Sequence, residues 1–399
     1  AVTITSNQVA NLAENAANND AVMTVATTGD SPSFFVINAG NADGIFAISN
    51  AGAITVLSNS NLNYEGGTTS YTLTIVATDA TTSDSDTVTI SVTDFDEFDV
   101  TFADPNDSDT DANTVAENAA ADAVAQVTAS ASDADGSTNT ITYSVTAQSC
   151  SGAFAVGSSS GVVTATGSGL NYESVTSCTV EITATSADTS AAAVTYTIAV
   201  TDFNEFDVTT PSDDDTNTNT VAENAANDAT VGVTALATDS DGTTNVVTYT
   251  ATANSCSDDN GDAAFAVDSG TGVVTVNDNA ALNYEAAQSC TITVRATSQD
   301  STTADTTFTI AVTDYDEFDV GAPSDSDTDT NTIGENSVAG TVAEITASAT
   351  DADGTTNTIT YSVTAQSCAN AFAVDSSTGI VTVADATNLD YEVATNNEC

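Results

Sequence analysis

An acidic octapeptide that recurs three times constrains the fold of this chain more than any other sequence feature. It reads TDFDEFDV from residue 93, TDFNEFDV from residue 201 and TDYDEFDV from residue 313. Each copy belongs to a repeating unit of roughly 100 residues, because other motifs recur with it in a fixed order. A long internal period of this kind predicts a tandem array of similar domains rather than one large domain.

Three further motifs define the units. Every unit contains a Glu-Asn pair near its start, in LAEN at 12–15, VAEN at 115–118, VAEN at 221–224 and IGEN at 333–336. Units 2 to 4 then carry DADG, DSDG and DADG from residues 133, 239 and 351, and all four carry LNYE or LDYE, from residues 62, 170, 282 and 389. These motifs predict four repeats, at 1–98, 99–206, 207–318 and 319–399.

The fourth repeat reaches Cys399 before the segments that correspond to the last two strands expected in repeats 1 to 3. A sandwich without these strands exposes edges and core. We therefore expect either that the chain is part of a longer polypeptide or that another subunit completes the repeat by strand addition.

Between the motifs, apolar and polar residues alternate with period two. In the segment 140–146, Ile141, Tyr143 and Val145 share one face of an extended chain and the intervening Thr and Ser residues share the other. Thr and Val dominate such segments, which favours strands, and no segment has a sustained helical period. The pattern predicts an all-β fold in which each unit is an immunoglobulin-like Greek-key β-sandwich.

The charge balance excludes several classes of partner. The chain has 57 acidic residues against Arg295 alone, for a net charge of −56. Nucleic acid and anionic membrane surfaces are excluded because both require Lys or Arg clusters, and no apolar run is long enough to predict membrane insertion. Because the carboxylates lack side-chain cations, bound divalent metal or screening by salt must neutralise them.

The six cysteines fall in three pairs, one in each of repeats 2 to 4. These pairs are Cys150 with Cys178, Cys256 with Cys290, and Cys368 with Cys399. None has the short spacing of a zinc or redox site, and the chain has no His. We expect three local disulfides, each of which ties two neighbouring connections within one sandwich. They place the protein in an oxidising, extracellular or cell-surface environment.

The ordered motifs resemble those of cadherin repeats, particularly the cadherin-like domains of bacterial and archaeal surface proteins, over nearly the whole chain. The resemblance implies Ca²⁺ at the joint between successive repeats. Its ligands would come from the opening Glu, the LDxE motif, the linker and the DxD motif of the next repeat. The implied ligands are Glu14, Glu65, Asp94, Asp96, Glu97, Asp133 and Asp135 at the first joint, Glu117, Glu173, Asp202, Asn204, Glu205, Asp239 and Asp241 at the second, and Glu223, Glu285, Asp314, Asp316, Glu317, Asp351 and Asp353 at the third.

Some positions depart from the family pattern. Asn replaces the Asp of LDxE at Asn63, Asn171 and Asn283, and Phe replaces the last Asn of the linker at Phe98, Phe206 and Phe318. The family's later Ala-x-Asp ligand is matched by Asp79, but Ser186 and Ser298 occupy its place in repeats 2 and 3. The number of ions at each joint therefore stays open, between one and three.

The chemistry of these residues agrees with a cation site. In an extended segment, residues i and i+2 point to the same side, so DAD and DFDE each aim two carboxylates in one direction. Ca²⁺ takes six to eight oxygen ligands, which two adjoining repeats together can supply. The alternative is an acidic linker that repels itself in water, but this does not explain why the acids recur at four separate motifs.

A second acidic run precedes repeats 2 to 4. It contains Asp107, Asp109 and Asp111 in repeat 2 and has counterparts at 212–219 and 324–331. Its spacing resembles the start of a calcium loop, but the Gly and final Glu of an EF-hand are missing. An additional ion and an exposed charged loop both stay open.

Catalysis is disfavoured because the chain has no His or Lys and its acids recur in every unit, whereas an active site would interrupt the repeat at one place. A carbohydrate site is disfavoured because there is no Trp and the tyrosines of LNYE are expected in core or joint packing. We expect a calcium-stabilised extracellular rod or filament subunit that self-associates end to end. The alternative is the stalk of a large adhesin that presents another binding domain to other cell-surface proteins.

Overall fold

The computed structural model describes residues 1–392 and 398–399. The chain divides into two compact units, residues 1–203 and 204–399, which are described separately. Buried apolar side chains in the described residues form four clusters, one within each predicted repeat. The predicted repeat boundaries remain a prediction and serve below as names.

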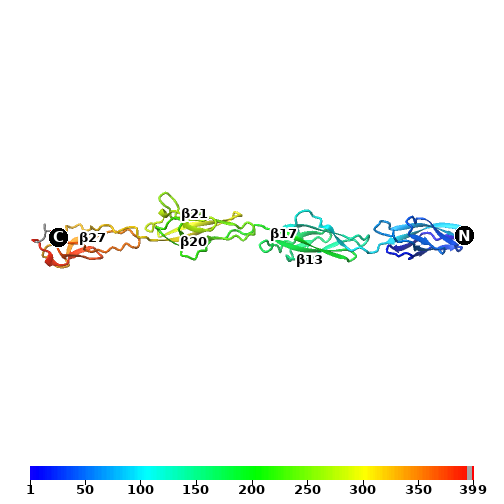
Figure 1. Cartoon of the computed structure of the whole chain (residues 1–399), viewed down its shortest axis with the longest axis horizontal. Coiled ribbons are helices and arrows are strands. Elements are labelled where there is room, and N and C mark those ends of the chain that lie inside the picture. Colours follow the sequence, from blue (N-terminus) through cyan, green and yellow to red (C-terminus); the bar gives the residue numbers. More distant parts are fainter. Residues whose placement is uncertain (393–397) are drawn as a thin grey trace. The chain divides into compact units, whose positions relative to one another are not determined.

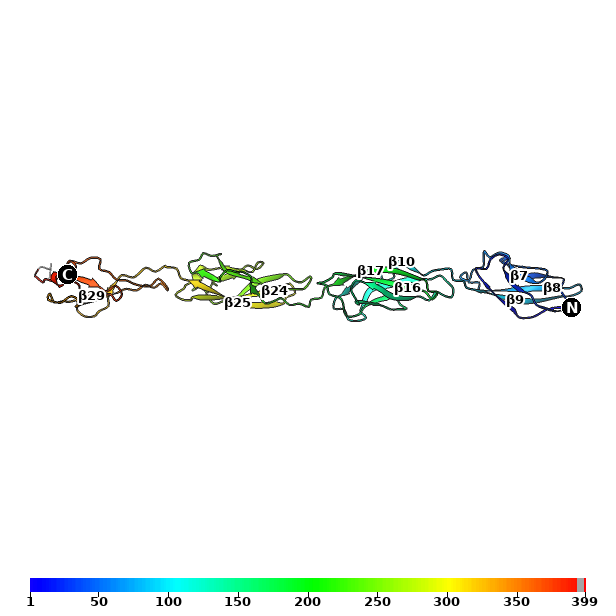
Figure 2. The same ribbon diagram turned by 90° about the horizontal axis from the view of Figure 1, so that it is seen from below.

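Repeat 1, in unit 1, has a four-stranded sheet in the order β2-β9-β8-β5, a three-stranded sheet in the order β3-β7-β6, and the pair β1-β4 (Figure 2). Its strands are β1 (Val2–Ile4), β2 (Gln8–Ala13), β3 (Ala21–Thr24), β4 (Thr27–Gly29), β5 (Phe34–Ala39), β6 (Phe46–Ile48), β7 (Ala53–Val56), β8 (Ser70–Thr78) and β9 (Ser83–Thr93).

Repeat 2 completes unit 1 with two four-stranded sheets, β10-β12-β15-β14 and β11-β17-β16-β13 (Figure 1). Its strands are β10 (Thr101–Asp107), β11 (Thr114–Ala116), β12 (Val124–Ser132), β13 (Thr142–Gln148), β14 (Phe154–Val156), β15 (Val162–Ala165), β16 (Ser177–Thr185) and β17 (Ala191–Thr201).

Repeat 3, in unit 2, has the same two sheets, β18-β20-β23-β22 and β19-β25-β24-β21. Its elements are β18 (Ser212–Asp213), β19 (Thr220–Ala222), β20 (Thr230–Leu236), β21 (Val247–Asn254), β22 (Phe265–Val267), β23 (Val273–Val276), the 3₁₀ turn η1 (Asn279–Ala281), β24 (Ser289–Ser298) and β25 (Thr303–Thr313).

Repeat 4 has one four-stranded sheet, β26-β27-β29-β28, within the described residues. Its elements are β26 (Ser324–Asp325), β27 (Val342–Ser348), β28 (Phe372–Val374), β29 (Ile380–Val383) and the 3₁₀ turn η2 (Ala386–Asn388). Residues 360–366 have the same sequence as β13, TYSVTAQ, but form no strand.

The period-two pattern explains the cores. In β8, Tyr71, Leu73, Ile75 and Ala77 are all buried while the residues between them are partly or fully exposed. The strands β16 and β24 bury alternate residues in the same way. The all-β prediction is therefore confirmed, and in each of repeats 1 to 3 the two main sheets bury their apolar faces against each other.

One feature of the topology positions the functional residues. In each of repeats 1 to 3, the second strand pairs in parallel with the last strand of the same repeat: β2 with β9, β11 with β17, and β19 with β25. The start and end of a repeat are therefore held next to each other in one sheet.

The three predicted disulfides are confirmed: Cys150 bonds to Cys178, Cys256 to Cys290 and Cys368 to Cys399. We expected each pair to tie two connections together. That detail is wrong for Cys178 and Cys290, which lie inside β16 and β24 because those strands begin earlier than the motif suggested.

Candidate metal-binding clusters

Strand pairing brings each opening Glu to its linker. In repeat 1, Ala13 at the end of β2 lies opposite Thr93 at the end of β9. Glu14 and Asp94 follow these residues, so they leave two parallel strands side by side. The same register sets Glu117 beside Asp202 and Glu223 beside Asp314, because Ala116 pairs with Thr201 and Ala222 with Thr313.

The opening Glu also organises the backbone around it. Glu14 accepts hydrogen bonds from the amides of Tyr64 (2.6 Å) and Phe95 (2.8 Å), which ties the LNYE loop to the linker. Equivalent bonds join Glu117 to Tyr172 and Phe203, and Glu223 to Tyr284 and Tyr315. A carboxylate has about four lone-pair sites, so each Glu keeps capacity for another partner.

Within unit 1, five of the predicted ligands of the first joint lie in two groups, one of which also contains Asp188. Carboxylate oxygens of Glu14, Glu65 and Asp94 lie within 4.8 Å of one another, and so do those of Asp96, Asp135 and Asp188. In unit 2, the same spacing joins Glu223, Glu285 and Asp314 of the third joint. The structure thus brings these predicted ligands together.

The two repeats of unit 1 contact each other through the DADG motif. The Gly136 amide donates to Glu65 (3.0 Å), and the amides of Glu97 and Phe98 donate to Asp135 (3.2 and 3.3 Å). A Cβ atom at Gly136 would collide with the Tyr64 ring, so this position requires Gly. The packing predicted for Tyr64 is therefore confirmed.

Unit 2 repeats this arrangement between repeats 3 and 4. The Gly354 amide donates to Glu285 (2.8 Å), and the amides of Glu317 and Phe318 donate to Asp353 (both 3.2 Å). A Cβ atom at Gly354 would collide with the ring of Tyr284. Asp351 accepts the amide of Asp353 (3.3 Å), which fixes the DAD segment. The packing prediction is wrong for Tyr391, whose side chain is exposed.

Several carboxylate oxygens at these joints are buried without a hydrogen-bond partner. They belong to Glu65, Asp94, Asp133 and Asp135 at the first joint, and to Asp314 and Asp353 at the third. Asp135 and Asp353 are each only 1% exposed. Buried polar atoms without partners are costly and rare. Since carboxylate oxygens are the ligands that Ca²⁺ prefers, these residues fit a calcium ion.

Burial, and after it neighbouring carboxyl groups, raise the pKa values of three acids at the first joint. Burial raises the pKa of Glu65 to about 7, helped by the hydrogen bond with Asp94 and the charge of Glu14. Burial, followed by the hydrogen bond with Asp135, raises the pKa of Asp96 to about 6. The pKa of Glu97 is raised by burial and by the nearby charge of Glu14. The first joint therefore resists full ionisation when it lacks a compensating cation.

The third joint behaves in the same direction. The pKa of Asp316 is raised, first by its hydrogen bond with Asp353 and then by the charge of that group. The pKa of Glu317 is raised by burial, followed by the charges of Glu223 and Glu285. Like-charge repulsion thus acts on the linker acids of the first joint, which lies within unit 1, and of the third joint, which lies within unit 2.

The second predicted set divides between the two units, and each half is described by itself. Unit 1 holds Glu117, Glu173 and Asp202, and unit 2 holds Asn204, Glu205, Asp239 and Asp241. In unit 2, the amides of Glu205 and Phe206 donate to Asp241 (3.1 and 3.2 Å), and Asp239 accepts the amide of Asp241 (3.1 Å). These local bonds are the same as those around Asp135 and Asp353.

Sequence reasoning missed two residues of these clusters. Asp188 joins Asp96 and Asp135 in unit 1, and Asp300 joins Asp239 and Asp241 in unit 2. Each stands two positions after the Ser that replaces the family's Ala-x-Asp ligand. The signal that would have found them is this displaced acid, in SAD and SQD.

In the second acidic run, an Asp side chain accepts backbone amide hydrogen bonds at a place where the pairing of two strands shifts register. Asp107 accepts the amides of Asp109 (3.0 Å) and Thr128 (2.9 Å), where the pairing of β12 with β15 shifts register. Asp213 and Asp325 make the same contacts in repeats 3 and 4. The hypothesis of an additional ion there stays untested.

Each linker exposes two aromatic rings. They are Phe95 and Phe98, Phe203 and Phe206, and Tyr315 and Phe318. The exposure of these rings was not predicted from the sequence.

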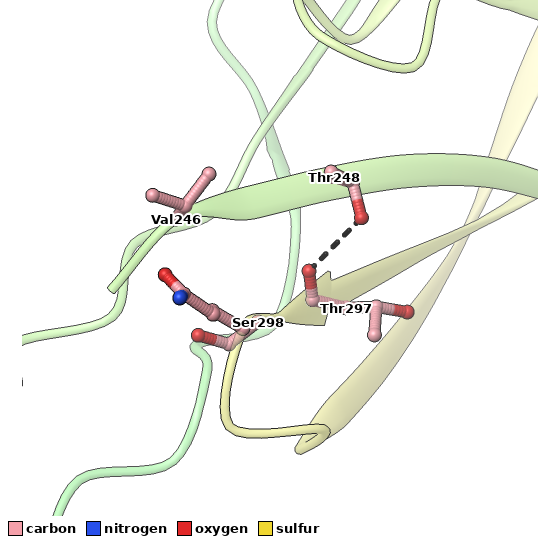
Figure 3. Close-up of a pocket in the computed structure, with 5 residues that line it drawn as sticks. Val246, Thr248, Thr297 and Ser298 are labelled. Carbon is pink, nitrogen blue, oxygen red and sulfur yellow. Dashed lines mark hydrogen bonds between the residues drawn. The ribbon is translucent and has the colours of Figure 1, made fainter. Parts of the chain in front are cut away.

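A hollow of about 240 Å³ lies at the ends of β21 and β24 (Figure 3). It is lined by Val246, Thr248, Thr297, Ser298 and Gln299, and the Thr248 hydroxyl donates to the Thr297 carbonyl (3.2 Å). None of the five lining residues is charged, so the hollow is distinct in chemistry from the carboxylate clusters. Across residues 1–392 and 398–399, no helix is long and apolar enough to cross a membrane.

Comparison with known proteins identifies the fold. The cadherin domain model matches residues 112–201 and 217–313. The structure of domains 1–5 of protocadherin gamma B2 is similar to this chain, with a TM-score of 0.69 and 17% identity. The match covers 98% of this chain and 75% of the protocadherin chain. Domains EC3–6 of protocadherin gamma B7 cover 96% and 91% (TM-score 0.67, 18% identity), and mouse cadherin-23 EC22–24 covers 78% and 98% (TM-score 0.57, 20% identity). No curated protein sequence matches.

Proposed function

Since the chain is a tandem array of cadherin-like domains, we propose that it is a calcium-stabilised extracellular structural rod or filament subunit. The observation that carries the proposal is the set of buried, unpartnered carboxylate oxygens at the first and third joints. Four such atoms at the first joint would be strongly unfavourable in a protein that never binds a cation there.

The chain's own residues prepare these sites. Glu14 and Glu223 tie the LNYE loop to the linker, so Glu65 and Glu285 are held beside Asp94 and Asp314. Bound Ca²⁺ would supply positive charge that removes the repulsion among them. The joint residues of both repeats would then be fixed by the same ion, which is how metal would stiffen the chain.

The extracellular part of the proposal is supported by the disulfides, which persist in oxidising compartments. The similar solved structures are described as extracellular cadherin domains, one of them as a cis-dimer. The net charge of −56 disfavours side-by-side contact between copies, so end-to-end association is the proposed mode. The alternative is an adhesin stalk, and we expect no catalytic activity in either case.

Small-angle scattering of the full chain tests the proposal. With Ca²⁺ we expect a narrow distribution of extended conformations, and with excess EDTA a broader and more compact one, because the empty joints repel and loosen. Identical profiles in the two conditions would contradict calcium stabilisation.

Matched variants sharpen the test. Glu65→Gln and Glu285→Gln remove a charge at one joint each and should each reproduce part of the EDTA effect. Glu181→Gln removes a charge in β16, where the side chain accepts a hydrogen bond from the Thr146 hydroxyl, and should behave as the unmodified chain. Electron microscopy with and without Ca²⁺ separates filaments, which support the subunit, from isolated chains, which favour the stalk.

A further inference from the structure

The turn between β24 and β25 holds an acidic side chain whose two oxygens have different surroundings. Asp300 Oδ1 accepts hydrogen bonds from the amide and the hydroxyl of Thr302, both at 2.8 Å. Asp300 Oδ2 is buried and has no hydrogen-bond partner. The turn therefore fixes the carboxylate and leaves one oxygen without a partner.

Two other carboxylates near it have the same division. Asp239 Oδ1 accepts the amide of Asp241, and Asp241 Oδ1 accepts the amides of Glu205 and Phe206. The Oδ2 atoms of Asp239 and Asp241 are buried without a hydrogen-bond partner, and Asp241 is only 1% exposed. Three carboxylates within 4.8 Å thus each anchor one oxygen to the backbone and leave the other without a partner.

The corresponding turn of repeat 2 belongs to a related cluster, in which the linker acid Asp96 takes the place of the first DxD acid. Asp188 Oδ1 accepts the amide (2.7 Å) and hydroxyl (2.8 Å) of Ser190, and its carboxylate lies with those of Asp96 and Asp135. Asp135 is 1% exposed and its Oδ2 has no hydrogen-bond partner. Because the acid of this turn joins a carboxylate cluster in both units, the cluster is not a chance feature of one loop.

Repeat 1 provides the contrast. Its acid stands two positions earlier, at Asp79, and both oxygens are used: Oδ1 accepts the amides of Thr81 and Thr82, and Oδ2 accepts the Val2 amide and the Thr82 hydroxyl. Repeat 1 also lacks the DxD motif. In repeat 1, which has no DxD motif, both oxygens of the acid accept hydrogen bonds from the fold. In repeat 3, which has the motif, Asp300 keeps one buried oxygen without a hydrogen-bond partner.

We propose that Asp188 and Asp300 are direct ligands of a divalent cation of the Ca²⁺ class, Asp188 together with Asp96 and Asp135, and Asp300 together with Asp239 and Asp241. In this chain they take over the ligand position that Ser186 and Ser298 vacate, displaced by two residues. The guanidinium of Arg295 is paired with Asp305, so no side-chain cation of the described residues serves these clusters instead. The inference rests on the proposed calcium binding.

Calcium titration of the metal-stripped full chain by isothermal calorimetry is the test. Asp300→Asn keeps Oδ1 for the Thr302 bonds but removes the charge and the free carboxylate oxygen. We expect it to weaken one class of sites by about tenfold or more, or to abolish it, since losing a ligand costs at least as much as losing an outer-shell partner. Asp188→Asn should do the same in repeat 2, as an independent copy.

Asp259→Asn is the matched control, because Asp259 is an exposed acid of repeat 3. It should titrate as the unmodified chain, and the circular dichroism of Asp300→Asn in EDTA should match the unmodified chain. If both ligand variants titrate as the unmodified chain while Glu223→Gln binds more weakly, this inference is overturned and the proposed function stands. If the unmodified chain binds no Ca²⁺, both are overturned.

Discussion

Repeat 1 and repeats 2 and 3 close the same corner of the sandwich by different chemistry. Tyr71, Cys178 and Cys290 are each the second residue of their strand, and each lies opposite an Ile in the last strand: Ile90, Ile198 and Ile310. In repeat 1 the Tyr71 ring meets the Phe46 ring edge-on, with centroids 5.3 Å apart. In repeats 2 and 3 the cysteines cross-link to Cys150 and Cys256.

The residues around this corner differ accordingly. Ile45 precedes Phe46 in repeat 1, whereas Ala153 and Ala264 precede the equivalent Phe in repeats 2 and 3, and all three are buried. Large apolar side chains fill the corner where there is no disulfide, and small ones where there is. The fold therefore does not require the cross-link, and apolar burial and chain cross-linking are alternative ways to stabilise one topology.

The largest effect expected is at Tyr71. Tyr71→Ala removes a buried aromatic ring that has no covalent substitute, so we expect repeat 1 to lose about 3 to 5 kcal/mol. Hydrogen–deuterium exchange in peptides from β8 and β9 would measure it, with β16 and β17 as internal controls. A loss below about 1 kcal/mol would mean that the ring pair does not replace the disulfide.

Reduction of the disulfides should have a slightly smaller effect on each repeat that contains one. The bonds close loops with sequence separations of 28, 34 and 31, and opening them should cost about 3 to 4 kcal/mol per repeat by the loop-entropy estimate. Exchange in β16 and β24 should accelerate under reducing conditions while exchange in β8 stays constant. Acceleration in β8 as well would show that the repeats are not independent.

The smallest effect concerns the joint to which repeat 1 contributes Glu65. Because the pKa of Glu65 is raised to about 7, its ionised form is disfavoured, so the metal-free joint loses stability as pH rises from about 4 to 7. Ca²⁺ requires the ionised form, so affinity should fall about tenfold from pH 8 to pH 6. Calorimetric titrations at the two pH values measure this. Glu65→Gln should remove most of the dependence, and its persistence would assign it to another group.

The sequence allowed the repeat, the strands and the disulfide pairs to be predicted because each depends on local pattern or motif order. The grouping of Glu14, Glu65 and Asp94 followed from the resemblance, because the motifs that carry these acids keep a fixed order in every repeat. Asp188 and Asp300 were missed because the resemblance points to Ser186 and Ser298, two positions earlier, and only the structure shows that the displaced acids join the clusters. That Tyr71 occupies the same position in its sheet as Cys178 and Cys290 is likewise seen only from the pairing of the strands.

Local pattern has a limit that one heptapeptide makes plain. TYSVTAQ forms β13 at residues 142–148, where it pairs with β16, but no strand at 360–366, where no strand of the described residues pairs with it. The same side chains thus form a strand only where a partner strand lies beside them, because the hydrogen bonds of a strand belong to the pair and not to the segment.

The parallel pairing of β2 with β9, β11 with β17 and β19 with β25 determines how repeats 1 to 3 would respond to a stretching force. A tensile force on the two ends of repeat 1 would pull β2 and β9 past each other along their length, which loads all residue pairs from Gln8↔Val88 to Ala13↔Thr93 at the same time instead of opening them in turn. In repeats 2 and 3 the corresponding ladders are shorter, from Thr114↔Ala199 to Ala116↔Thr201 and from Thr220↔Ala311 to Ala222↔Thr313. Under tension, the parallel strand pairs of repeats 2 and 3 would therefore separate before that of repeat 1. The disulfides of repeats 2 and 3 would then limit the length by which each of these repeats can extend.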